Sequence, residues 1–238
     1  MPPDVSELDA MFERNDMFPL TARLRDAQIA SEIVMDMNWL QAKLYNGAGF
    51  FMAYAYMHDL WRLGSAIPGD AGEEMKQSAG MIFVYSLVLV TVDGLRCADV
   101  TAPVGRRDQL FSQNQPLIYY VRTQPRTTRM TLGTMALEIE VATATVRKND
   151  CVLCSGGLAQ IKEGLEAQGQ SPLPQVPNAA GVLGKTFAVP AAPGYTPQFV
   201  DEDVWGAKQA AARRELPASL TRFLTLPSDT SSASPQSP

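Results

Sequence analysis

The most apolar stretch of the chain is AGMIFVYSLVLVTV, residues 79–92, which contains no charged side chain. A membrane-spanning helix needs about 20 apolar residues, and a run of about 10 to 14 more often marks a buried core helix. Good helix formers and acidic side chains precede the run, and Gly94 offers a C-terminal stop. We therefore predict a buried central helix from about Ala71 to Gly94. A buried strand and membrane association are the alternatives, because the run is apolar on every face.

Apolar residues at steps of three and four predict further helices on both sides of this run. The predicted helical segments are residues 4–16, 20–45, 50–63, 105–120 and 158–167. The second of these is the first long helix. The third is rich in aromatic side chains, and the fourth is expected to break at Pro116, because proline cannot continue the backbone hydrogen-bond pattern.

The segment 126–148 is ambiguous between helix and strand. Its LEIEVATAT portion alternates and is β-branched, as in an exposed strand. The apolar residues continue for more than about 20 positions, however, and no second strand is evident for pairing, while an isolated strand is unstable in water. We interpret this segment as a helix.

The fold class that follows is all-α. We expect an irregular bundle of five or six helices over residues 4–168, arranged around the buried central helix. The remainder, 169–238, is a long low-complexity tail that begins as a linker rich in proline, glycine and alanine. Residues 200–226 show a broken amphipathic pattern and are expected to dock on the core or on a partner, with Trp205 and Phe223 as candidate anchors. The end of the chain is predicted to be disordered.

The formal net charge of −5 is unevenly distributed, and residues 101–150 are the basic part. An acidic chain with a small basic patch is a poor general binder of nucleic acid, because that affinity depends on neutralising several phosphates. The arginines of this part are either a solvated face that pairs with acidic residues or a site for an anion or an acidic partner. These candidates are Arg106, Arg107, Arg122, Arg126 and Arg129.

The three cysteines, Cys97, Cys151 and Cys154, allow four interpretations. The first is a structural disulfide from Cys97 to Cys151 or Cys154, which requires an oxidising compartment. The second is a redox dithiol formed by the C-x-x-C pair near a helix N-terminus, although the βαβ context of thioredoxin-like proteins is missing. The third is a metal site with His58 as the fourth ligand, for which one C-x-x-C is a weak signal. The fourth is that the cysteines are inert buried residues.

His58 is the single histidine of the chain, and it lies beside Asp59. General base catalysis could use it, but adjacent residues on a helix point in directions about 100° apart. A packed, hydrogen-bonded histidine is therefore the preferred interpretation. The sequence contains no nucleophile elbow, Walker loop, dinucleotide-binding glycine motif or di-metal carboxylate set.

These patterns favour a non-catalytic helical binding or scaffold protein with a protein partner of unknown identity. The alternative is a thiol-redox or disulfide-bearing protein that uses Cys151 and Cys154 with Cys97. We expect no cofactor, no metal, no nucleic acid and no membrane span. The N-terminus shows no signal-peptide pattern, which predicts a cytoplasmic location. A periplasmic location is the alternative if the N-terminus is incomplete or a disulfide is present.

Overall fold

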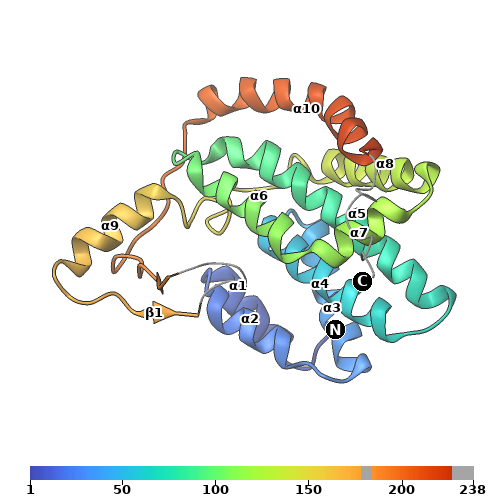
Figure 1. Cartoon of the computed structure of the whole chain (residues 1–238), viewed down its shortest axis with the longest axis horizontal. Coiled ribbons are helices and arrows are strands. Elements are labelled where there is room, and N and C mark those ends of the chain that lie inside the picture. Colours follow the sequence, from blue (N-terminus) through green and yellow to red (C-terminus); the bar gives the residue numbers. More distant parts are fainter. Residues whose placement is uncertain (178–183, 227–238) are drawn as a thin grey trace, which may run out of the picture.

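The computed structural model describes residues 1–177 and 184–226, and this part of the chain is mainly helical (Figure 1). The elements are α1 (Val5–Glu13), α2 (Met17–Asp26), α3 (Ala30–Tyr45), α4 (Phe50–Ala66), α5 (Asp70–Val92), the 3-10 helix η1 (Asp93–Arg96), α6 (Thr101–Gln113), α7 (Gln115–Thr123), α8 (Arg126–Thr143), α9 (Leu158–Gln168), β1 (Gln175–Val176), β2 (Thr186–Phe187) and α10 (Glu202–Thr225). The predicted all-α class is confirmed. Within the described residues the helices are more numerous than the five or six expected.

The predicted central helix is α5, and the other helices of the bundle surround it (Figure 1). It contacts α4, α6, α7, α8 and α10, and nearly all of the apolar run 79–92 is buried. The segment Asp70–Arg96 is long and apolar enough to cross a membrane, and 78% of its most apolar window is buried inside the protein. Helices of this chain therefore cover the run, and the absence of a membrane span stays a prediction.

The predicted long helix over residues 20–45 is wrong in one respect, because it consists of two helices. α2 ends at Asp26, and the backbone is extended at Ala27 and Ile29 before α3 begins. The carbonyl oxygen of Ala27 accepts a hydrogen bond from Nη1 of Arg62 on α4, at 2.9 Å. This bond satisfies a backbone group that a continuous helix would use internally. The apolar stripe runs through the break, so periodicity alone did not reveal it.

Two other predictions are confirmed: the break near Pro116, and the interpretation of the segment that begins at residue 126 as a helix. The chain breaks at Asn114, between α6 and α7, and Pro116 lies in the first turn of α7, where its missing N–H costs no helical hydrogen bond. Residues 126–143 form the helix α8, which buries Leu132, Ala136 and Glu140 on one side. Packing against α5 gives this β-branched segment the tertiary contacts that favour a helix.

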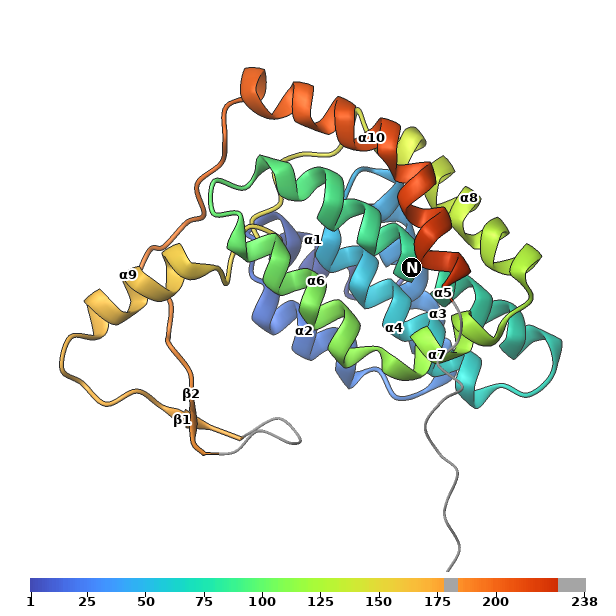
Figure 2. The same cartoon turned by 45° about the horizontal axis from the view of Figure 1, so that its top comes forward.

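The C-terminal third of the described chain has two parts with different surroundings. α9 was expected to be the last helix of the core, and the antiparallel pair of β1 and β2 lies in the segment predicted as a linker. Both project from the body of the bundle (Figure 2). α10 lies across α8 and α5, and it buries Leu216, Leu220 and Leu224 there. The segment 200–226 thus docks on the core of its own chain. The predicted disordered end, from residue 227 on, lies outside the described residues.

Candidate functional site

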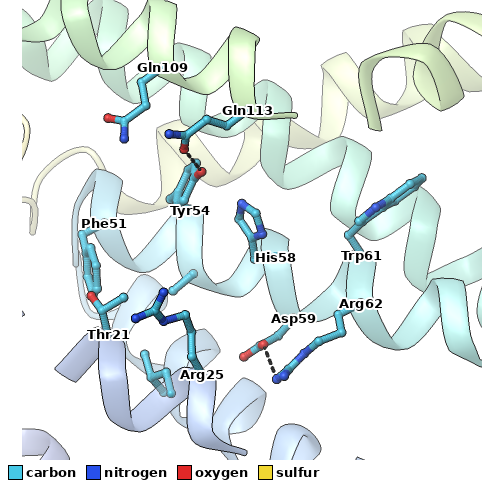
Figure 3. A pocket seen from close by; sticks show the side chains of 12 residues that line it. Thr21, Arg25, Phe51, Tyr54, His58, Asp59, Trp61, Arg62, Gln109 and Gln113 are labelled. Atoms are coloured by element: carbon cyan, nitrogen blue, oxygen red, sulfur yellow. Dashed lines mark hydrogen bonds and ion pairs between the residues drawn. The ribbon is translucent and has the colours of Figure 1, made fainter. Parts of the chain in front are cut away.

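A cavity of about 700 Å³ opens between α2, α4 and α6 (Figure 3). α4 supplies its floor, and α2 and α6 supply opposite walls. The lining side chains are Thr21, Leu24, Arg25, Phe51, Tyr54, Ala55, His58, Asp59, Trp61, Arg62, Gln109 and Gln113. Aromatic groups and a few polar groups thus converge in one concave site, which is the usual composition of a small-molecule pocket.

The sequence of α4 explains why this helix presents an aromatic face to the cavity. Phe51, Tyr54, His58 and Trp61 recur at steps of three and four, so they lie along one side of the helix. The buried residues of α4 recur on other sides, where the helix packs against α3 and α5. Gly64 allows the close approach to α5, because a Cβ there would lie 2.9 Å from the carbonyl oxygen of Gly72. These contacts cover the aromatic face of α4 only in part, so Phe51, Tyr54 and Trp61 are half-buried and His58 is exposed.

Two ring groups near the α6 wall are held in fixed positions. The hydroxyl of Tyr54 donates a hydrogen bond to Oε1 of Gln113 at 2.7 Å, which joins α4 to α6. The imidazole of His58 packs on the Tyr54 ring, with 4.6 Å between the ring centroids. The ring of His58 reaches the solvent of the open pocket, yet desolvation by the surrounding groups lowers its pKa, and the nearby charge of Arg62 adds to this effect. His58 is therefore neutral at pH 7 and can donate and accept hydrogen bonds.

Asp59 and Arg62 form an ion pair at the base of the cavity. Nη2 of Arg62 donates to Oδ1 of Asp59 at 3.0 Å (Figure 3). Asp59 is 7% exposed, and burial raises the pKa of its carboxyl to about 6 despite the opposing effect of the guanidinium. Asp59 is therefore mostly ionised at pH 7, and its charge offsets that of Arg62. The pair also fixes Arg62 for its hydrogen bond to Ala27.

Arg25 is the cation of this site that lacks a carboxylate partner. It lies in the last turn of α2, and Figure 3 shows its side chain extending toward the space below Tyr54 and His58. Within residues 1–177 and 184–226, its guanidinium takes part in no ion pair. An exposed, unpaired guanidinium at the edge of an aromatic cavity can bind a carboxylate or another oxyanion in a bidentate manner.

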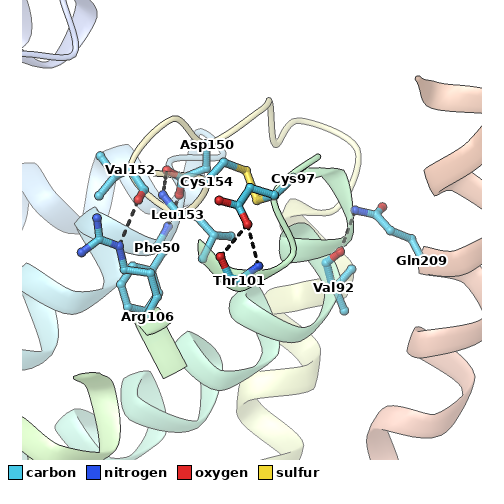
Figure 4. The surroundings of a disulfide bond; sticks show 11 residues. Phe50, Val92, Cys97, Thr101, Arg106, Asp150, Val152, Leu153, Cys154 and Gln209 are labelled. Carbon is cyan, nitrogen blue, oxygen red and sulfur yellow. Dashed lines mark hydrogen bonds between the residues drawn. A yellow bond between two sulfur atoms is a disulfide. The ribbon is translucent and has the colours of Figure 1, made fainter. Parts of the chain in front are cut away.

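The three cysteines that the sequence suggested as functional residues lie outside the aromatic pocket. Cys97 and Cys154 form a disulfide, with 5.1 Å between their Cα atoms (Figure 4). Cys151 is a free thiol. One of the disulfide pairings predicted from the sequence is therefore present, and its two thiols are not available to a metal. Burial raises the pKa of the Cys151 thiol, and the neighbouring Asp150 carboxylate raises it further. This thiol is mostly protonated at pH 7, which opposes nucleophilic chemistry.

The segment between α8 and α9 that carries Cys154, called the disulfide loop below, also supports the first turn of α4. The carboxylate of Asp150 accepts hydrogen bonds from the backbone N–H of Phe50, at 2.6 Å, and of Leu153, at 2.9 Å (Figure 4). A side chain thereby satisfies one of the unpaired N–H groups at the helix start, although it comes from a distant part of the sequence. The loop thus helps to position the helix that carries the aromatic face.

The predicted arginine patch is divided over several elements. Arg106 donates through Nε to the carbonyl oxygen of Val152 in the disulfide loop, and Arg107 pairs with its neighbour Asp108. Arg122 lies on α7 and Arg126 opens α8. Arg129, also on α8, donates to the carbonyl oxygen of Leu226, which is the last described residue. None of the five lines the aromatic pocket.

The two predicted docking anchors make contacts inside the chain. The indole of Trp205 stacks on the guanidinium of Arg96, with 4.6 Å between the guanidinium carbon and the ring centroid. Phe223 packs against Phe83 and Phe111, with ring centroids 6.3 and 5.8 Å apart. These aromatic residues hold α10 on the bundle, and docking of a protein partner through them stays a prediction.

No protein-family model, curated protein or solved structure matches this chain. In the part of the chain that the structure describes, no group of three His, Cys, Asp or Glu side chains could hold a metal ion. Sequence reasoning singled out the aromatic helix and His58 but missed Arg25, Gln109 and Gln113. Their contribution depends on the positions of α2 and α6, and no local pattern marks it. Function must therefore be inferred from the geometry and chemistry of the pocket.

Proposed function

We propose that this protein is a non-catalytic binding protein, and that its pocket between α2, α4 and α6 holds a small molecule with a flat apolar body and one anionic group. The observation that carries this proposal is the aromatic face of α4, formed by Phe51, Tyr54, His58 and Trp61, which borders the cavity of about 700 Å³. Aromatic faces left uncovered beside a concave space are typical of ligand sites, since burying them against a ligand removes apolar area from water.

The apolar body of the ligand is inferred from the walls of the pocket. Phe51 and Trp61 lie at the two ends of the aromatic face (Figure 3). Ala55, a small residue between them in the sequence, also lines the cavity. The ring of Trp61 also packs against Tyr120 of α7, with centroids 5.6 Å apart, so its orientation is fixed before a ligand arrives. Preorganised aromatic walls reduce the entropy lost on binding.

The anionic group is inferred from the charges of the lining. Asp59 offsets the charge of Arg62, and His58 is neutral, so Arg25 supplies the uncompensated positive charge. Gln109 and Gln113 add uncharged hydrogen-bonding groups on the opposite wall. A carboxylate directed at Arg25, with its apolar body over α4, would satisfy both kinds of lining at once.

The thiol-redox alternative has less support. Cys154 is joined to Cys97 instead of Cys151, and the free thiol of Cys151 has a raised pKa. The pocket side chains include a histidine and an aspartate, but Asp59 pairs with Arg62, and His58 packs on Tyr54. Neither of these two contacts orients the histidine as a general base, which favours binding over catalysis.

The proposal can be tested with 8-anilinonaphthalene-1-sulfonate, a fluorescent probe with an aromatic body and one sulfonate. We expect saturable binding at one site and energy transfer from tryptophan to the probe. Arg25→Gln should weaken binding about fivefold, as expected when one charge-assisted contact is lost. Ala55→Trp, which places an indole ring inside the cavity, should weaken binding more strongly than Arg25→Gln.

Arg107→Gln is the matched control, because Arg107 is an exposed arginine outside the pocket. Urea unfolding of each variant must remain cooperative, since partly unfolded chains bind this probe non-specifically. Unchanged binding by both Arg25→Gln and Ala55→Trp would contradict the proposed site.

A further inference from the structure

We propose that a second cavity, formed by η1, the segment 144–149 and the N-terminal half of α10, is a binding site for a small oxyanion of the phosphate type. The cavity has a volume of about 670 Å³, and its lining includes Arg96, Lys148, Trp205 and Arg213. It lies on a different face from the aromatic pocket and shares no lining residue with it. The proposal is therefore independent of the function proposed above.

Arg96 is the residue that points to a ligand. It is 5% exposed, and its Nη1 donates to the carbonyl oxygen of Arg147 at 3.0 Å. The nearest carboxylate oxygen, Oδ1 of Asp93, lies 4.0 Å from Nη2, which is beyond hydrogen-bond distance. The Nε of Arg96 has no hydrogen-bond partner among the described residues. Buried guanidinium groups are normally hydrogen-bonded to acceptors. Arg96 lines the cavity and is incompletely hydrogen-bonded within the described residues.

The charges around Arg96 do not balance within the buried cluster. Arg147 pairs with Asp93 at 2.7 Å and with Glu140 at 2.8 Å. Arg213 pairs with the same oxygen of Glu140, also at 2.8 Å. Three guanidinium groups, counting Arg96, therefore share two carboxylates. Arg96 reaches Asp93 only at 4.0 Å, so its buried charge is partly compensated. Incomplete compensation of a buried charge is costly, and an anion bound at Arg96 would reduce that cost.

Two features hold the site in shape before a ligand binds. The Trp205 ring stacks on the Arg96 guanidinium, which restricts the guanidinium to one orientation. Nε2 of Gln209 donates to the carbonyl oxygen of Val92 at 3.0 Å and holds α10 over η1 (Figure 4). These contacts fix the first half of α10 relative to the buried arginines.

The start of α10 adds favourable dipoles. The helix has 24 residues, and its N-cap Asp201 makes no side-chain hydrogen bond to it. The N–H groups of Val204 and Trp205 donate to the carbonyl oxygen of Asp201. The N–H groups of Glu202 and Asp203 have no acceptor within the described residues. Asp201, Glu202 and Trp205 all line the cavity, which places this helix start at its edge. Backbone N–H groups at a helix start together with arginines are a common arrangement for binding phosphate groups.

The size and charge of the ligand are limited by two acids at the entrance. Asp201 and Glu202 are exposed and border the same cavity. Their negative charges repel a polyanion but leave Arg96, Lys148 and Arg213 to bind a single compact group. This charge balance favours inorganic phosphate or a small phosphate monoester over a nucleoside triphosphate or a nucleic acid.

Titration calorimetry with inorganic phosphate, and separately with glycerol 3-phosphate, tests the proposal at constant ionic strength set with chloride. We expect saturable binding of at least one probe with one site per chain. Tighter binding of the ester would identify the ligand as an organic phosphate, and tighter binding of inorganic phosphate would identify it as free phosphate. Equal binding would mean that the site recognises the phosphate group alone. Arg96→Lys should weaken binding about tenfold, because an ammonium cannot replace the planar fork of the guanidinium.

Two surface variants keep the proposal falsifiable if Arg96→Lys fails to fold. Lys148→Gln should weaken binding about threefold, and Glu202→Gln should strengthen it about threefold, since each changes one charge at the entrance. A variant that merely misfolds cannot bind more tightly. Lys162→Gln on the exposed helix α9 should match the wild type. Absence of saturable binding, or identical affinities for Lys148→Gln, Glu202→Gln and the wild type, would overturn the proposal.

Discussion

The guanidinium of Arg147 donates a hydrogen bond to the carboxylate of Asp93 at 2.7 Å, although 54 residues separate them in the sequence. Both side chains are almost completely buried, and the same guanidinium also pairs with Glu140. This network connects η1 at the end of the central helix with α8, and Arg213 extends it to α10. It is therefore a polar junction between elements that lie far apart in the chain.

Removal of Arg147 is expected to destabilise the fold strongly. Arg147→Ala leaves two buried carboxylates without their main partner, and we expect a loss of about 3–5 kcal/mol in the free energy of unfolding. Urea denaturation followed by circular dichroism measures it. Arg107→Ala removes an exposed pair and should change stability by less than about 0.5 kcal/mol. Similar small effects for both variants would contradict the assignment of the buried network.

The disulfide is expected to contribute to stability by closing a large loop. Cys97 and Cys154 are 57 residues apart, and the chain-entropy relation assigns about 4 kcal/mol to a loop of this size. The double variant with serine at both positions should lose a comparable amount in urea denaturation. Alkylation of the unreduced protein, followed by intact-mass measurement, should modify Cys151 alone. Three modified cysteines would mean that the bridge does not form.

Leu224 tests whether α10 is part of the core. It is 2% exposed, and one of its methyl carbons lies 2.6 Å from where a Cβ of Gly133 would be. Leu224→Ala should therefore cost about 2–4 kcal/mol of unfolding free energy. Val204→Ala, on an exposed position of the same helix, should cost far less. If the two variants have equal stability, α10 is a segment that waits for a partner, as the sequence pattern also allows.

The buried carboxyl of Asp59 predicts a specific pH dependence of stability. Its pKa is raised from 3.8 to about 6 in the folded protein, so the folded state binds a proton more tightly than the unfolded state. The contribution of this group is most favourable below pH 4 and declines as the pH rises through 6, by about 2–3 kcal/mol in total. Asp59→Asn cannot ionise and removes this decline.

The measurement is urea denaturation of the wild type and Asp59→Asn at pH 4, 5, 6 and 7. The stability of the wild type relative to the variant should fall across this range. His58, whose pKa is lowered, is present in both proteins, so its own pH effect cancels in the difference. A constant difference between pH 4 and 7 would show that the carboxyl of Asp59 is not desolvated.

Several features of the fold were predictable from local patterns. The charge-free run 79–92 identified the buried helix, because a run apolar on every face is stable only where other elements cover all of it. The break near Pro116 followed from the missing N–H of proline. The disulfide was one of the pairings inferred from three cysteines, but the sequence did not decide between Cys151 and Cys154.

Other features depend on distances that no local pattern encodes. The break between α2 and α3 is supported by Arg62, which is 35 residues beyond Ala27. The aromatic spacing of α4 was visible in the sequence, but whether that face fills the core or borders a cavity depends on how α2 and α6 pack beside it. The incomplete pairing of Arg96 likewise results from the division of two carboxylates among three arginines. The sequence by itself determined the helical class and its central helix, because these follow from periodicity and hydrophobicity within single segments. Only the tertiary structure decided the two cavities and the charges that face them, because these arise where separate segments meet.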